Sequence, residues 1–318
     1  GATNGSIAVH VAEQDAVLEM LFDRDTGAGF SAMKTVIGGT DFQSASPDWY
    51  TYADVRGPDA DPLANFGIDR DLGPNGLVTY IRRARDAGGD FLLQAPMDFP
   101  PDWMLVELGV NHNVDPAHYE DLANYYVRYV EAYEAEGIHV DLVSLFNEPL
   151  NYTHIPREDL LVVLRDHVGP AFERAGLTTG IMLGEVWSHA WAREWYPLIL
   201  DDAAARPFVD AMGYHSYDFN LYSDIAWLAD TYPGIPIWQT EACCHRPRFV
   251  FEWDDGGWWA DVLFEDVEND TAAWLYWNMI LDETGGPWLV SPVHGNPEYN
   301  AQPALVSIDR TTHEVLFT

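Results

Sequence analysis

Short apolar runs alternate with longer amphipathic stretches along the whole chain, and this alternation limits the folds that the chain can adopt. It is typical of βα units that build a parallel sheet covered by helices. The runs with strand character are Ala32–Ile37, Phe91–Ala95, Leu142–Phe146, Ile181–Leu183, Ala211–Tyr214, Ile235–Gln239 and Ala273–Trp277. A further run near Ala2–Ile7 would bring the number of strands to eight.

Helices are predicted between these strands, at stretches that end near a glycine or a proline. They are Gly76–Ala87, Pro116–Ala135, Arg157–Ala175 and Ser223–Asp230. Eight βα units favour a closed barrel over an open doubly wound sheet, and no GxGxxG motif of a dinucleotide fold follows the first strand. We therefore predict an α/β fold in which residues 1–318 form a single (β/α)8 TIM barrel.

The chain is strongly acidic, with 51 Asp and Glu against 16 Lys and Arg and a formal net charge of −35. Because phosphate backbones repel a polyanion, we expect no nucleic-acid partner. The acidic residues are spread along the chain and Lys34 is its only lysine, which favours adaptation to high salt over an ordinary acidic enzyme. We expect an extracellular protein in a hypersaline environment, although no signal segment opens the chain.

Two further classes are not predicted. No run of about 18 apolar residues occurs, so we expect no membrane span. The two cysteines, Cys243 and Cys244, are adjacent, and the 11 histidines show no HExxH or comparable spacing. The sequence therefore predicts no metal site.

Two glutamates directly follow predicted strands. Glu148 comes after the run that ends at Phe146, and Glu241 comes after the run that ends at Gln239. Either one alone is more simply explained as a helix cap or a solvated loop carboxylate. In a barrel, however, the carboxyl ends of the strands carry the chemistry, and two carboxylates can face each other there. Glycosidic cleavage needs such a pair, one protonated and one ionised.

Aromatic residues cluster at the other predicted strand ends. Trp187, Trp238 and Trp277 are candidates for flat surfaces that stack against sugar rings. A core position is the commoner place for any single tryptophan. Several of them at strand ends beside two carboxylates favour a carbohydrate site.

The chain resembles glycoside hydrolase family 30, and within it the acid β-glucosidase (glucosylceramidase) group and its microbial relatives. The motifs that carry this resemblance, in chain order, are Ile37-Gly-Gly-Thr-Asp41-Phe42, Tyr50-Thr-Tyr-Ala-Asp54, Ala95-Pro96 through Pro101-Asp-Trp103-Met104, Asn147-Glu148-Pro149, Thr240-Glu241-Ala242-Cys243 and Trp277-Asn278 through Gly285-Gly286-Pro287. The Asn-Glu-Pro triplet alone is moderately specific, whereas the ordered set is highly specific.

The resemblance implies a role for each matching residue. It makes Glu148 the general acid/base and Glu241 the nucleophile, and it has Asn147 hydrogen-bond the sugar 2-hydroxyl. The other implied substrate-site residues are Asp41, His215, Tyr217, Trp277 and Lys34. Tyr217 is expected to hold the nucleophile ionised and oriented. Lys34 occupies the place of an arginine in relatives, and a lysine does not offer the arginine's planar fork of donors.

The chain departs from the family pattern at three points. Met97 replaces a tryptophan and Ser216 replaces the tryptophan of a His-Trp-Tyr segment, so aromatic surface near the sugar is lost. Relatives also carry a β-sandwich built from segments before and after the barrel, which we expect to be absent here. An incomplete barrel would expose apolar surface, which leaves a homo-oligomer as an expectation.

We therefore predict a retaining β-glycoside hydrolase that cleaves β-linked glucose-type glycosides through a covalent glycosyl-enzyme, with a carbohydrate partner and no metal or organic cofactor. An endo-acting β-1,6-glucanase, xylanase or cellulase on the same site is the alternative within the enzymes. A non-catalytic carbohydrate-binding barrel is the alternative outside them.

Overall fold

The computed structural model describes residues 11–40, 50–108, 111–150, 155–243, 253–283, 304–309 and 311–317. Its centre is a seven-stranded sheet with the order β1-β2-β5-β6-β7-β8-β9, in which every neighbouring pair is parallel. The strands are β1 (Ala32–Lys34), β2 (Leu92–Pro96), β5 (Leu142–Ser144), β6 (Gly180–Val186), β7 (Ala211–His215), β8 (Ile237–Glu241) and β9 (Thr271–Trp274). All seven overlap the predicted runs, while the run at Ala2–Ile7 lies outside the described residues.

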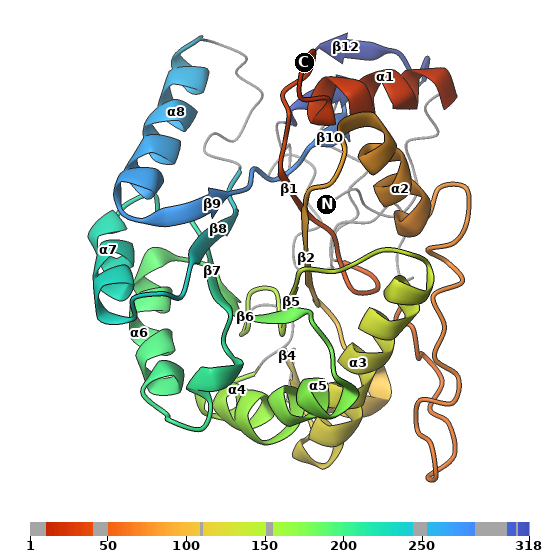
Figure 1. Ribbon diagram of the computed structural model, residues 1–318, viewed down its shortest axis with the longest axis vertical. Coiled ribbons are helices and arrows are strands. Elements are labelled where there is room, and N and C mark those ends of the chain that lie inside the picture. Colours follow the sequence, from red (N-terminus) through yellow and green to blue (C-terminus); the bar gives the residue numbers. More distant parts are fainter. Residues whose placement is uncertain are drawn as a thin grey trace.

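Helices form a ring outside the curled sheet, as Figure 1 shows. They are α1 (Val11–Phe22), α2 (Leu77–Gly88), α3 (Tyr119–Ala135), α4 (Arg157–Val162), α5 (Gly169–Ala175), α6 (His189–Leu200), α7 (Tyr222–Thr231) and α8 (Trp253–Glu268). The π-helical stretch η3 (Val163–Val168) joins α4 to α5, and single 3-10 turns lie at η1 (Asp102–Met104), η2 (Pro116–His118) and η4 (Arg206–Phe208). The nearly closed parallel sheet with its outer helices confirms the (β/α)8 TIM barrel.

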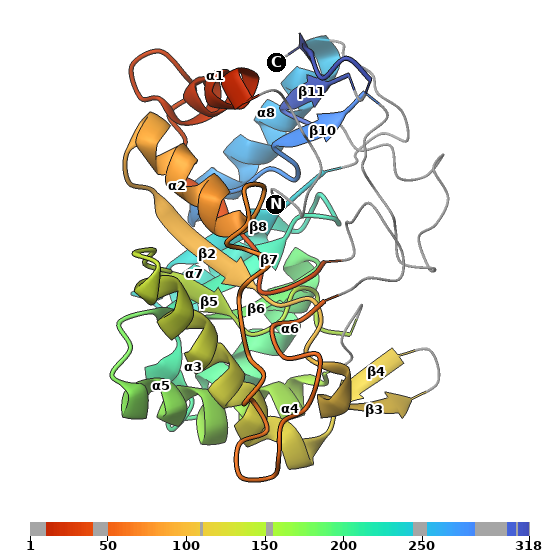
Figure 2. The same ribbon diagram turned by 90° about the vertical axis from the view of Figure 1, so that its right-hand side faces the viewer.

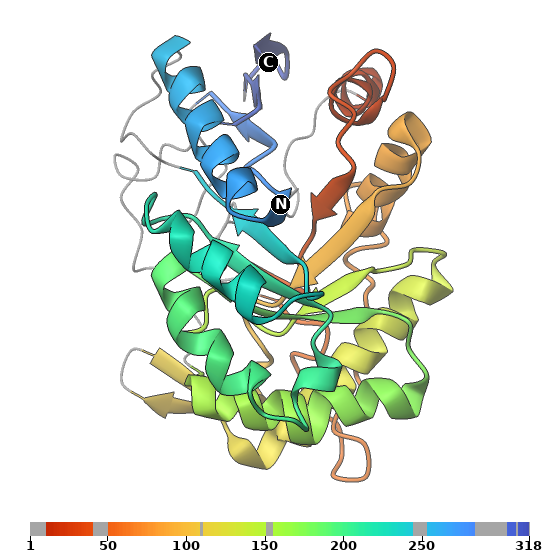
Figure 3. The same cartoon turned by 60° about the vertical axis from the view of Figure 1, so that its left-hand side comes forward.

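The four predicted helices are all present, but the sequence analysis missed α1, α6 and α8. It also missed two smaller sheets. β3 (Leu105–Leu108) and β4 (Asn111–Val114) form an antiparallel hairpin that projects from the loop side of the barrel (Figure 2). β10 (Ile280–Asp282), β11 (Val306–Ile308) and β12 (Val315–Phe317) form a three-stranded sheet, which Figure 3 shows between α8 and α1.

Helix α3 packs on the barrel through an aromatic face. Its tyrosines at positions 125, 126, 129 and 133 recur at helical spacing and are fully buried. Tyr126 donates its hydroxyl proton to the backbone oxygen of Leu145, which directly follows β5 and lies three residues before Glu148. The helix therefore fixes the strand end that carries Glu148.

A buried carboxyl group ties the long segment between β1 and α2 to α3. Asp71 accepts hydrogen bonds from the hydroxyls of Tyr50, Tyr52 and Tyr133, at 3.2 Å from Tyr50 and 2.7 Å from Tyr133. Burial raises the pKa of Asp71, and the three hydroxyl donors oppose that rise. These bonds satisfy a carboxyl group that would otherwise be costly to bury.

The Asp71 cluster gives a stability prediction with an internal control. Tyr133→Phe removes one donor from the buried carboxyl group and should lower the free energy of unfolding by about 1–3 kcal/mol. Tyr80→Phe, on α2, removes a buried hydroxyl that has no hydrogen-bond partner among the described residues, so it should be neutral or slightly stabilising. Urea titrations of both variants measure this, and equal losses would contradict the assignment.

Candidate active site

The two candidate glutamates lie at the same rim of the barrel and face each other. Glu148 follows β5, Glu241 is the last residue of β8, and both side chains are largely buried. One carboxylate oxygen of Glu148, one of Glu241 and a ring nitrogen of His215 all lie within 4.8 Å of one another. The sequence therefore predicted correctly which strand ends meet, because parallel strands bring their carboxyl ends to one rim.

The backbone at Glu148 is held in an uncommon conformation. Its φ of 45° falls in the left-handed region that few residues other than glycine adopt. The Glu148 N–H donates to the backbone oxygen of Glu185 at 2.9 Å, and the Asn147 N–H donates to that of Met97 at 2.8 Å. Strain of this kind persists only where the surroundings impose it, and it occurs often at functional sites.

Glu241 has three cationic or donor neighbours. Tyr217 Oη donates to its Oε1 at 2.7 Å, Lys34 Nζ donates to its Oε2 at 3.0 Å, and His215 Nε2 lies 3.8 Å from the same oxygen. Burial alone would raise the pKa of Glu241, but the charges of His215 and Lys34 and the tyrosine hydrogen bond lower it below its ordinary value. Glu241 is therefore held as a carboxylate.

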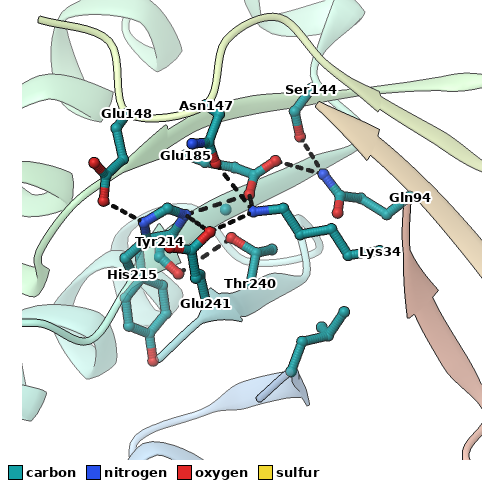
Figure 4. Close-up of polar contacts among 12 residues, drawn as sticks. Lys34, Gln94, Ser144, Asn147, Glu148, Glu185, Tyr214, His215, Thr240 and Glu241 are labelled. Atoms are coloured by element: carbon teal, nitrogen blue, oxygen red, sulfur yellow. Dashed lines mark hydrogen bonds and ion pairs between the residues drawn. The ribbon is translucent and has the colours of Figure 1, made fainter. Parts of the chain in front are cut away.

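Lys34 lies at the centre of the polar contacts shown in Figure 4. Its Nζ donates to Asn147 Oδ1 at 3.0 Å, to Glu185 Oε2 at 2.8 Å and to Glu241 Oε2 at 3.0 Å, which uses all three of its protons. Its Nζ also lies 5.8 Å from the centre of the Trp277 ring. Since Lys34 is buried and is the only lysine in the chain, the protein surface carries none.

His215 joins the two sides of the site. Its Nδ1 lies 2.8 Å from Glu148 Oε1 and its Nε2 lies 3.4 Å from Glu185 Oε2. Burial alone would lower the pKa of His215, but Glu241, Glu148 and Glu185 raise it to about 9. At neutral pH the imidazolium therefore donates from both ring nitrogens, an assignment that follows from its acidic partners.

Glu185, on β6, is a site residue that the sequence analysis did not identify. Its side chain is fully buried and accepts hydrogen bonds from Lys34, from His215 and from Gln94 Nε2. Burial would raise the pKa of Glu185, but Lys34 and His215 lower it to about 2. A signal was present, because Glu185 closely follows the predicted strand Ile181–Leu183 just as the two candidate glutamates follow theirs.

The remaining predicted residues differ in their placement. Trp238 packs in the core with Met182 and Leu275, so it is not a sugar-stacking surface. Trp277 is buried beside Lys34, whereas Trp187 is 38% exposed at the end of β6.

The two residues that depart from the family pattern are also buried. Met97 Sδ lies 3.6 Å from the hydroxyl of Tyr126, and the Ser216 hydroxyl donates to Asp266 at 3.1 Å. Neither side chain replaces the lost aromatic surface. Asp41 lies outside the described residues.

One cluster among the described residues has the geometry of a metal site, and it is formed by Glu148, His215 and Glu241. Its chemistry fits a proton-sharing cluster better. Metal ligation needs a neutral imidazole, whereas three carboxylates raise the pKa of His215 to about 9. The ammonium of Lys34, 3.0 Å from Glu241, adds a fixed positive charge that would repel a cation.

Comparison with known proteins agrees with this barrel. The family profile described as the glycosyl hydrolase family 30 TIM-barrel domain matches residues 3–309. The chain belongs to glycosyl hydrolase family 30. No helix in the described part of this family member is both long and apolar enough to cross a membrane.

Curated relatives within the family carry two kinds of name. An endo-1,6-beta-D-glucanase of Neurospora crassa is 28% identical over 315 residues, which cover 95% of this chain and 62% of the relative. A putative glucosylceramidase of Caenorhabditis elegans is 27% identical over 332 residues, covering 95% and 59%. The lysosomal acid glucosylceramidase of Mus musculus is 23% identical over 264 residues, covering 75% and 50%. The chain thus spans about three fifths or less of these relatives.

Solved structures show the same fold. SrfJ from Salmonella typhimurium superposes with a TM-score of 0.82 at 20% identity, covering 96% of this chain and 67% of that one. An endo-β-1,6-glucanase superposes with a TM-score of 0.80 at 23% identity, covering 97% and 69%.

The contacts of Glu241 predict a shift in the pH dependence of activity. Tyr217→Phe removes a donor from the carboxylate, so the pKa of Glu241 should rise and its ionised form should be lost at a higher pH. The acid limb of kcat/KM on an aryl β-glycoside should move up by about half to one pH unit, and the plateau should fall about tenfold. An acid limb at the wild-type position would contradict this role for Tyr217.

Proposed function

We propose that the chain is a retaining β-glycoside hydrolase that cleaves β-linked glucose-type glycosides by double displacement. The observation that supports this is the approach of Glu148 and Glu241 to within 4.8 Å between carboxylate oxygens. Retaining enzymes hold their two carboxyl groups about 5–5.5 Å apart, whereas inverting enzymes leave about 6.5–9.5 Å for a water molecule. The site has the spacing for direct attack by a carboxylate.

In the first step Glu241 attacks the anomeric carbon, the glycosidic C–O bond breaks, and Glu148 donates a proton to the departing oxygen, which leaves as an alcohol. Tyr217 and Lys34 fix both oxygens of the Glu241 carboxylate, so the attacking group loses little freedom in the transition state. Lys34 donates to Asn147, so the atom that faces it is the amide oxygen, and the Asn147 amide NH2 is left to donate to the sugar 2-hydroxyl.

In the second step Glu148 removes a proton from water, which attacks the glycosyl ester and releases Glu241. His215 Nδ1, 2.8 Å from Glu148 Oε1, holds the Glu148 carboxyl group in position for this step. One residue thus serves first as acid and then as base.

Endo action on β-1,6-glucan is the second candidate, and the relative from Neurospora crassa is the specific observation that favours it. Trp187, partly exposed at the end of β6, offers a flat surface near the site that a polymer chain would use. Cleavage of internal bonds would separate this reading from a glucosidase that removes single terminal sugars.

Salt-tolerant activity and an extracellular location remain our proposals. The formal charge of −35 and a surface without lysine support salt-tolerant activity. The most direct test is to compare hydrolysis rates at low and at molar salt.

The reaction type and the substrate are tested together. Proton NMR during hydrolysis of an aryl β-glucoside should show the β-anomer as the first product, and Glu241→Gln should lower kcat by at least about 10³-fold. The panel includes β-1,6-glucan, xylan, and aryl β-xyloside, β-fucoside and β-galactoside. The α-anomer as first product would exclude the double displacement, and no turnover of any substrate would favour a non-catalytic binding barrel.

A further inference from the structure

Glu185 is placed in the site by a local irregularity of β6. The register between β6 and β7 shifts between Gly184 and Val186, so Glu185 is the extra residue of a β-bulge. Gly184 has a φ of 81°, and a Cβ at this position would meet the Tyr196 hydroxyl at 2.0 Å. The glycine therefore permits the bulge that turns the Glu185 carboxylate toward Lys34.

Glu185 is linked to both catalytic glutamates, directly to the backbone of Glu148 and through shared cations to Glu241. Its backbone oxygen accepts from the Glu148 N–H at 2.9 Å. Its carboxylate shares Lys34 with Glu241, at 2.8 Å from Nζ against 3.0 Å, and it also receives His215 Nε2 at 3.4 Å. The same two cations thus serve Glu185 and the nucleophile.

Two cations contact the Glu185 carboxylate, Lys34 of β1 and His215 of β7, and the hydroxyl of Tyr196 of α6 is close by. The same two cations also lie beside Glu241 of β8, and His215 contacts Glu148. With Glu185 the site holds three carboxylates and two cations. Without it, both cations would act on Glu241 and Glu148 alone.

We propose that Glu185 is a positioning residue that draws Lys34 and His215 partly away from Glu241. This keeps the Glu241 carboxylate reactive as a nucleophile. It also keeps both cations paired with a carboxylate when Glu241 becomes a neutral ester. This proposal rests on the proposed function. The transition state carries positive charge on the sugar, so unbalanced cations beside it would raise the barrier. A buried ion pair is commonly no more stabilising than apolar residues of the same volume, so packing alone does not explain a carboxylate here.

Kinetics test the proposal through a pH profile as well as a rate. Glu185→Gln should lower kcat about 100-fold, the order expected for loss of a unit charge several ångströms from the reacting atoms. The acid limb of the kcat/KM profile should move to lower pH, because removing a neighbouring anion lowers the pKa of Glu241. Glu185→Asp, which keeps the charge, should recover part of the rate and keep the wild-type limbs.

A matched control separates charge from packing. Asp71→Asn also neutralises a buried carboxyl group, but one whose hydrogen-bond partners are Tyr50, Tyr52 and Tyr133, so it should lower stability and leave the limbs where they are. Glu185→Gln with a reduced rate but wild-type limbs would overturn the proposal and assign Glu185 a merely structural role.

Nuclear magnetic resonance tests the charge sharing without any substrate. Because the chain has one lysine, ¹⁵N-lysine labelling gives a single Nζ signal. In Glu241→Gln, a neutral mimic of the ester, Glu185 should keep Lys34 protonated through about pH 9, whereas the Glu185→Gln/Glu241→Gln double variant should lose that charge at lower pH. Equal titration of Lys34 in the two variants would overturn the proposal even if the chain proves inactive on every glycoside.

If the double variant does not fold, the single variant Glu241→Gln still tests the proposal. Deprotonation of Lys34 in that variant below about pH 8 would overturn it.

Discussion

The ammonium group of Lys34, shared between Glu185 and Glu241, is the interaction on which the rest of the site depends. Two carboxylates this deeply buried would be costly as free charges. Their contacts with one buried cation at 2.8 and 3.0 Å allow both to remain ionised. The third donor of Lys34 orients Asn147, so one side chain fixes the nucleophile and the neighbour of the acid/base.

The barrel makes this arrangement reachable from distant parts of the chain. Lys34 comes from β1, Glu185 from β6 and Glu241 from β8, and parallel strands bring all three to one rim. The surrounding helices and loops then set the details. Tyr126 of α3 holds the end of β5, and the bulge at Gly184 turns Glu185 inward. Lys34, Glu185 and Glu241, which are far apart in the sequence, therefore lie close enough to share charge.

Much of the fold and of the candidate site could be predicted from the sequence, because both depend on the spacing of apolar residues and on the residues that follow each strand. The seven described strands, the helices α2, α3 and α7, and the meeting of Glu148 with Glu241 all follow from apolar runs and from what succeeds them. Helix α6 was missed because Pro197 interrupts its pattern. Trp238 was misjudged as a sugar-stacking candidate because sequence alone does not show which face of a strand is buried by its neighbours. Glu185 follows a predicted strand as the other two glutamates do, but the inward orientation of its side chain depends on a β-bulge, which the apolar pattern does not reveal.

The central claim is that Glu241 attacks the sugar directly. A 2-deoxy-2-fluoro-β-glucoside with a good leaving group slows hydrolysis of the ester more than its formation, so the glycosyl-enzyme accumulates. Mass spectrometry of the intact protein and then of its peptides should show one added fluoroglucosyl group, attached to Glu241. A label on Glu148, or inactivation by the reagent without any covalent label, would contradict the account.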